Sequence, residues 1–166
     1  MTNDRRNVSY LTLKESGLTL KVLFITLLII GGLMPCVADD VTYLTTQQFK
    51  DRIFDYTTQA EWQYKGDKPC VIDFYTTWCG PCKRLAPIME ELSQTYCDQV
   101  KFYKVDTERE RELAGVFRIS SIPQVLYIPV GGEPIMLKGL YPKENIIEII
   151  DEYLLHKPKA DAKGAK

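Results

Sequence analysis

The sequence predicts a mixed α/β domain in which helices flank one mixed β-sheet, made of parallel strands and an antiparallel edge hairpin. From Asp39 onward, the spacing of apolar residues alternates between the period of 2 typical of strands and the period of 3.6 typical of helices. The resulting order, βαβαβαββα, allows the first three strands to be parallel through helical crossovers. A chain of 166 residues is long enough to bury the core of one such domain.

The first half of the domain contains two strands and two helices. The expected elements are a strand at 41–44, a helix capped by Thr45 or Thr46, a polar loop at 57–69, the β-forming strand 70–75 and a helix from Pro81 or Cys82 to about Tyr96. The first helix should place Phe49, Ile53 and Tyr56 on one face, because their spacing is helical.

The second half adds a strand, a short helix, a hairpin and a closing helix. These are expected at 100–106, at 109–117, at 124–130 with 134–138, and around 146–154. Leu113, Val116 and Phe117 should face inward from the short helix. The domain is expected to run from 39 to 156, and the charged tail 157–166 to be disordered.

Composition and charge exclude one class of partner. The net charge is −1, and no run of Lys and Arg interleaved with aromatic residues could follow a phosphate backbone. We therefore expect no nucleic-acid partner, and we expect a mildly acidic, monomeric protein.

The N-terminal segment has the pattern of an export signal. Four basic residues precede a charge-free stretch from Val22 to Ala38, and Asp39 and Asp40 follow it. Its length as a helix, about 26 Å, is slightly less than the hydrocarbon core of a bilayer. Residues 1–38 are therefore read as a signal peptide cleaved after Ala38, or alternatively as a retained membrane anchor, which would be the chain's only membrane contact. Both alternatives place the domain outside the cytoplasm, as in a periplasm.

The cysteines do not suggest a metal site or a disulfide framework. There are five, Cys36, Cys70, Cys79, Cys82 and Cys97, and one histidine, His156, in the C-terminal tail. A structural zinc site commonly uses two CxxC pairs, and this chain has one. A disulfide across a CxxC pair closes a loop too short to stabilise the fold much.

A redox role explains more of the residues around the CxxC pair. Cys79 lies between a buried strand and a helix, where free N–H groups and the helix dipole favour a thiolate. Cys79 would attack a substrate disulfide, and Cys82, one turn later, would release the reduced substrate by forming the Cys79–Cys82 bond. No cofactor is expected, since the chain has no GxGxxG loop.

The motif WCGPCK, at 78–83, resembles the active site of the thioredoxin family. The resemblance covers about Val41 to Leu155 and includes Asp73, Pro87, KVD at 104–106, SIPQ at 121–124 and Gly139. It implies the thioredoxin fold and protein-disulfide oxidoreductase activity, with Cys79 as the nucleophile and Cys82 as the buried resolving cysteine.

The resemblance also implies a surface that binds an extended polypeptide substrate. Its expected residues are Trp78, Gly80, Pro81, Ile122, Pro123 and Gly139. Pro123 resembles the family's cis-proline, although X-Pro bonds in general are mostly trans. Gly139 would let a substrate backbone approach, or alternatively is an ordinary loop glycine.

Asp73 interrupts an otherwise apolar strand. Burial should raise its pKa, and it is expected to accept the Cys82 proton through water; the alternative is a core aspartate satisfied by local hydrogen bonds. Bacterial thioredoxins commonly pair this aspartate with a lysine, but Phe102 stands at the aligned position. We therefore expect Asp73 to lack a cationic partner and its pKa to be raised further.

The sequence indicates thiol-disulfide exchange more clearly than it indicates whether the protein reduces or oxidises its substrates. Gly80-Pro81 between the cysteines resembles the reducing members of the family, so we expect a reductant of disulfide-containing proteins. It would need a separate thiol electron donor, either a membrane relay or another thioredoxin-like protein. The alternatives are a disulfide oxidant or isomerase, and a binding module with idle cysteines. A second disulfide between Cys70 and Cys97 stays open.

Overall fold

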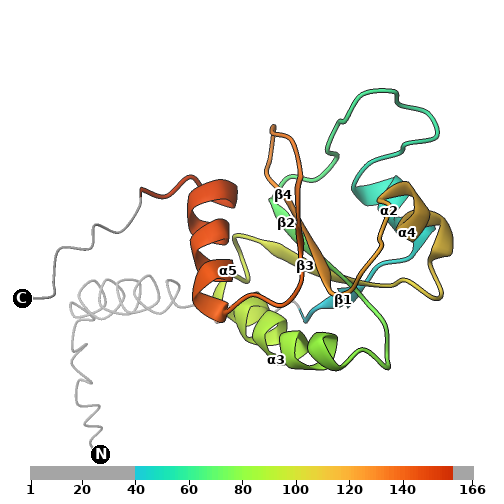
Figure 1. Ribbon diagram of the computed structural model, residues 1–166. Helices are drawn as coiled ribbons and strands as arrows, with labels where there is room; N and C mark the ends of the chain where they lie inside the picture. The colour runs from blue at the N-terminus through green and yellow to red at the C-terminus, as the bar shows by residue number, and fades with distance from the viewer. Residues whose placement is uncertain (1–39, 159–166) are drawn as a thin grey trace, which may run out of the picture. The chain divides into compact units, whose positions relative to one another are not determined.

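The computed structural model describes residues 40–158 and arranges them as a mixed sheet flanked by helices, as the sequence predicts (Figure 1). The elements are β1 (Thr42–Tyr43), α2 (Thr46–Arg52), β2 (Cys70–Tyr75), α3 (Gly80–Thr95), β3 (Lys101–Asp106), α4 (Arg111–Val116), β4 (Gln124–Ile128), β5 (Ile135–Lys138), α5 (Lys143–Ile149) and a π-helical turn (Ile150–Leu154).

The five strands of the described sheet lie in the order β1-β3-β2-β4-β5. β1 and β2 both pair with β3 in parallel, and β4 pairs antiparallel with β2 and with β5. The predicted parallel strands and edge hairpin are therefore confirmed. Since β2 has a neighbour on each side, the cysteine motif that follows it starts from the centre of the sheet.

Side chains of β2 alternate between two cores, one on each face of the sheet. Cys70, Ile72 and Phe74 face the core that α2 and α4 cover, whereas Val71 faces the core that α3 and α5 cover (Figure 1). Because strand side chains alternate with a period of 2, Asp73 lies on the same face as Val71 and points toward α3. The core on that face is built mainly of apolar side chains, so a buried carboxyl group is an exception there.

Two predicted helices are shorter than expected. α2 is capped by Thr45, whose side chain accepts from the Gln48 N–H, and its C-cap is Ile53, so Tyr56 lies beyond it. Tyr56 still packs against Phe49, with ring centroids 6.3 Å apart. In α4, Leu113 is buried, but Val116 is 44% exposed, so its predicted inward orientation is wrong. Leu113 and Phe117, four residues apart, supply the buried face of this one-and-a-half-turn helix, and Val116 lies at its edge.

The predicted signal peptide at 1–38 and the tail residues 159–166 lie outside the described residues. Within residues 40–158, no helix is long and apolar enough to cross a membrane. Lys157, at the start of the predicted tail, forms an ion pair with Asp151, with 2.8 Å between Nζ and Oδ1.

Candidate active site

Cys79 is the N-cap residue of α3. It follows β2 through a short turn closed by a hydrogen bond from its N–H to the Thr76 carbonyl, at 3.4 Å. The Cys82 N–H donates to Cys79 Sγ at 3.2 Å. The first turn of α3 thus directs an otherwise unpaired backbone donor at this sulfur, which is the arrangement that stabilises a thiolate. Cys79 and Cys82 form a disulfide, with their Cα atoms 5.3 Å apart.

Exposure does not distinguish the two cysteines in this oxidised form. Cys79 is 4% exposed and Cys82 is 3% exposed. The asymmetry lies in position instead, because Cys79 caps the helix and Cys82 lies inside its first turn, facing the sheet. This difference agrees with unequal roles, in which the capping sulfur is the one best placed to carry negative charge.

The segments predicted to bind substrate meet the cysteines at one edge of the sheet. Gln124 on β4 pairs with Phe74 near the end of β2, so Pro123 lies beside the strand that leads to Cys79. The Ile122–Pro123 peptide bond is cis, as predicted. Gly139, after β5, donates its N–H to the Pro123 carbonyl at 2.8 Å.

Gly139 adopts φ +98°, a region that favours glycine. A Cβ atom built on it would meet no other atom within 4 Å. The glycine is therefore required by its backbone conformation, and the space beside it is open. Trp78, which is 67% exposed, borders the cysteines together with the exposed Gly80 and Pro81. The role of these residues in substrate binding stays a prediction.

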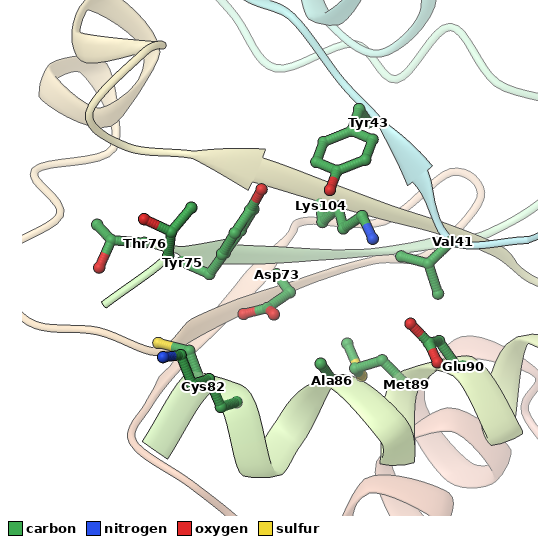
Figure 2. A pocket seen from close by; sticks show the side chains of 12 residues that line it. Val41, Tyr43, Asp73, Tyr75, Thr76, Cys82, Ala86, Met89, Glu90 and Lys104 are labelled. Atoms are coloured by element: carbon green, nitrogen blue, oxygen red, sulfur yellow. The ribbon is translucent and has the colours of Figure 1, made fainter. Parts of the chain in front are cut away.

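Asp73 lies in a cavity behind the cysteines, where residues of β1, β2, β3 and α3 enclose about 280 Å³. Figure 2 shows its carboxyl group between the sheet and α3, with Cys82 and Thr76 toward one end of the cavity and Lys104 and Val41 toward the other. Asp73 is 5% exposed, and its Oδ1 has no hydrogen-bond partner in the protein. Burial raises the pKa of Asp73 to about 7.

The expectation that Asp73 lacks a cation is wrong. Lys104 on β3 lies opposite Asp73 in the parallel pair, and its charge lowers the Asp73 pKa against the larger effect of burial. Its Nζ is 4.3 Å from the centroid of the Tyr43 ring, which holds the ammonium group by a cation–π contact. Positions 102 and 104 share one face of the strand because side chains alternate; Lys104 lines the cavity, whereas Phe102 lies in the apolar core on that face.

Thr76 was not identified as a site residue from the sequence. It is 3% exposed, it lines the same cavity, and its Oγ1 has no hydrogen-bond partner in the protein. Its place between the strand and the cysteine motif is visible in the sequence, but the burial of its hydroxyl is a tertiary feature that the local sequence does not show.

The remaining cysteines do not extend the site. Cys70 is a buried free thiol, so it does not pair with Cys97, and burial raises its pKa to about 12. A thiol in that state is a poor nucleophile at neutral pH. Within residues 40–158, no cluster of His, Cys, Asp or Glu side chains could hold a metal ion.

Comparison with known proteins gives consistent matches. The sequence profile of the thioredoxin family matches residues 40–152. A thioredoxin of Borreliella burgdorferi is 42% identical over 110 residues, which are 66% of this chain and 94% of that protein. A chloroplastic M-type thioredoxin of Brassica napus is 37% identical over 54% of this chain and 51% of its own length. The crystal structure of chloroplastic thioredoxin z superposes with a TM-score of 0.56 and 27% identity, over 67% of this chain and 91% of that one.

The raised pKa of Asp73 gives stability a specific pH dependence. An exposed carboxyl in the unfolded chain has a pKa near 4, whereas that of Asp73 in the folded protein is about 7. Between these values the unfolded chain binds fewer protons, so the contribution of Asp73 to the free energy of unfolding falls as pH rises. D73N cannot ionise at this position. Between pH 4 and pH 8, we therefore expect its free energy of unfolding to rise by up to about 4 kcal/mol relative to that of the unmodified protein.

Urea unfolding at both pH values measures this difference. D98N is the matched control, because Asp98 is exposed and its substitution removes the same charge. If the difference in free energy of unfolding between D73N and the unmodified protein stays constant from pH 4 to pH 8, the pKa of Asp73 is not raised.

The effect of the Lys104 charge on the Asp73 pKa can be tested separately. K104M removes the cation opposite Asp73 and leaves the burial of the carboxyl in place, so the Asp73 pKa should rise above about 7. NMR titration of the Asp73 carboxyl carbon measures the midpoint. K138M, which removes an exposed lysine from the sheet edge, should leave it unchanged. If the midpoint in K104M equals that of the unmodified protein, Lys104 does not act on Asp73.

Proposed function

Because the chain belongs to the thioredoxin family and is a protein-disulfide oxidoreductase, we propose that it reduces disulfides of protein substrates outside the cytoplasm. The observation that carries the proposal is the Cys79–Cys82 pair at the N-terminus of α3, with Gly80-Pro81 between the sulfurs. A Gly-Pro dipeptide between the cysteines is the sequence feature that favours reduction.

The proposed cycle uses both sulfurs in turn. Starting from the dithiol, the Cys79 thiolate attacks a substrate disulfide, forms a mixed disulfide and releases one substrate thiolate. Cys82 then loses its proton to Asp73 and attacks Cys79 Sγ. The Cys79–Cys82 bond forms, the bond to the substrate breaks, and the second substrate thiolate takes up a proton. Two electrons have passed from the cysteine pair to the substrate.

The proposed substrate surface is the open edge around the cysteines. An extended polypeptide would lie along Ile122 and Pro123, beside Trp78, with its backbone approaching Gly139. The open space at Gly139 and the exposure of Trp78 support this arrangement.

The proposed location rests on the sequence of residues 1–38. Their basic start, apolar centre and small residues before Asp39 fit a cleaved export signal or an anchor. A reductant outside the cytoplasm needs a supply of electrons, so a separate thiol donor, soluble or held in the membrane, completes the proposal. We propose that the protein acts as a monomer.

The reduction potential of the cysteine pair tests the direction of the reaction. We expect equilibration with glutathione or dithiothreitol buffers to give a potential well below −200 mV, near the family's value of about −270 mV. C79S, which cannot form the disulfide, is the control for signals from other thiols. A potential above about −200 mV would show an oxidant or isomerase instead, and failure of the pair to exchange at all would indicate a binding module.

The proposed location has its own test. Expression of the full chain followed by fractionation and N-terminal sequencing should recover a mature protein that begins at Asp39, outside the cytoplasm. Replacing three apolar residues, Leu27, Leu28 and Ile29, with Asp should abolish export, because charges interrupt the apolar centre. An uncleaved protein in the membrane fraction would favour the anchor, and an uncleaved soluble protein in the cytoplasm would refute the export proposal.

A further inference from the structure

The strand that leads to Gly139 ends in a charged residue. Lys138 is the last residue of β5 and is exposed. In the β4–β5 pair it lies opposite Gln124, the residue that directly follows Pro123. β5 is the outer strand of the described sheet, so the Lys138 side chain reaches solvent beside the segment proposed to hold the substrate.

The ammonium group of Lys138 is within reach of a peptide bound at this segment. Residues opposite each other in antiparallel strands have Cβ atoms about 5 Å apart, and Pro123 is one residue further along the chain from Gln124. Lys138 also precedes Gly139, whose N–H donates to the Pro123 carbonyl at 2.8 Å. Because lysine carries its charge on a flexible four-carbon stem, the charge would lie beside the residues that flank the substrate cysteine.

Lys138 has no ion-pair partner among the residues that the structure describes. The same holds for Lys83 and Arg84, which are exposed in the first turn of α3. Carboxylates outnumber basic side chains in residues 40–158, so these unpaired cations around the cysteines do not reflect a generally basic domain. Glu108, after β3, is an exposed carboxylate at the same edge and offsets them in part.

We propose that Lys138 is a specificity-determining residue, whose ammonium group favours substrates with a carboxylate within two residues of the disulfide cysteine. This inference rests on the proposed function, because it concerns a peptide that lies along Ile122 and Pro123. Opposite charges across an interface accelerate encounter and select partners more than they add affinity. The preference should therefore appear in the second-order rate of disulfide exchange and weaken when salt screens the charges.

The chemistry of exchange stays the same in this role. Two electrons pass from the cysteine pair to the peptide disulfide, the Cys79–Cys82 bond forms, and the two peptide sulfurs leave as thiolates that take up protons. Lys138 exchanges neither a proton nor a covalent bond. Its charge raises the local concentration of acidic peptides near Cys79.

Three peptides test the preference with the full-length protein in a neutral detergent. Each peptide contains one disulfide, and they differ only in carrying Glu, Gln or Lys at the two positions on either side of each cysteine. Chromatography of acid-quenched samples measures the rate of reduction. At low ionic strength, we expect the Glu peptide to be reduced about three- to tenfold faster than the Gln peptide, and the Lys peptide more slowly than either. The differences should largely disappear in about 0.5 M salt.

Substitutions at Lys138 separate its effect from the intrinsic reactivity of each peptide. K138E should reduce the ratio of the Glu-peptide rate to the Gln-peptide rate to one or below, and K138R, which keeps the charge, should preserve the ratio. R52E is the matched control, because it makes the same change of charge at an exposed residue. Arg52 lies in the last turn of α2, which leads from the end of β1 back toward the start of β2, away from the cysteines. R52E should keep the ratio of the unmodified protein.

An unchanged ratio in K138E would overturn the inference, and so would an equal loss in R52E, which would indicate the net charge of the domain instead. K138Q replaces K138E if that variant does not fold. Reaction of the reduced peptides with the oxidised protein repeats the comparison in the opposite direction, so the ratio does not depend on the direction of electron flow. If no peptide reacts in either direction, the proposed function is wrong as well; if all three react at equal rates, only the role of Lys138 is wrong.

Discussion

The pairing of β2 along both of its edges positions every part of the site. β3 aligns Lys104 with Asp73 on one side, and β4 aligns Gln124 with Phe74 on the other. Because β2 is parallel to β3 and antiparallel to β4, its carboxyl end meets the start of β4, where the cis Ile122–Pro123 bond lies. The first turn of α3 then places Cys79 at the same edge. A slip of one residue in either pairing would move Asp73 to the opposite core and separate it from Cys82.

Burial of side chains in the core stabilises the sheet, but it makes the ionised form of Asp73 energetically unfavourable. A carboxyl group in an apolar cavity is unfavourable when ionised, so a residue chosen only for stability at this position would be apolar. The positive charge of Lys104, across the strand pair, makes ionisation of Asp73 less unfavourable. The compensation is partial, since the Lys104 ammonium group contacts the Tyr43 ring. Full neutralisation by a direct ion pair would return the pKa toward that of an ordinary carboxyl. The partial compensation keeps it near 7.

The sequence predicts most of the fold because the signals are local. The period of 2 in CVIDFY and the helix after the cysteine motif match β2 and α3 closely. The sequence predictions fail where tertiary contacts determine the orientation and burial of a side chain. Val116 is apolar and helical in spacing, yet it is exposed, whereas Leu113 is buried and Phe117 is partly buried against the same core. Lys104 is not predicted as the cation near Asp73, because the family resemblance points to position 102, although side-chain alternation puts both residues on one face of the strand. The Thr76 hydroxyl is buried without a partner in the protein, a tertiary feature that no local pattern encodes.

A general base works best when its pKa lies near the pH at which it acts. Burial of Asp73 in the cavity brings its pKa into that range. A carboxylate with an ordinary pKa would be fully ionised at neutral pH but would bind the Cys82 proton weakly. Raising the pKa to about 7 leaves a large fraction ionised and strengthens the affinity of that fraction for a proton. The energetic cost of burying Asp73 is therefore also the source of its basicity. An apolar replacement would stabilise the sheet and, in the proposed cycle, leave Cys82 without an internal acceptor at the moment it attacks Cys79.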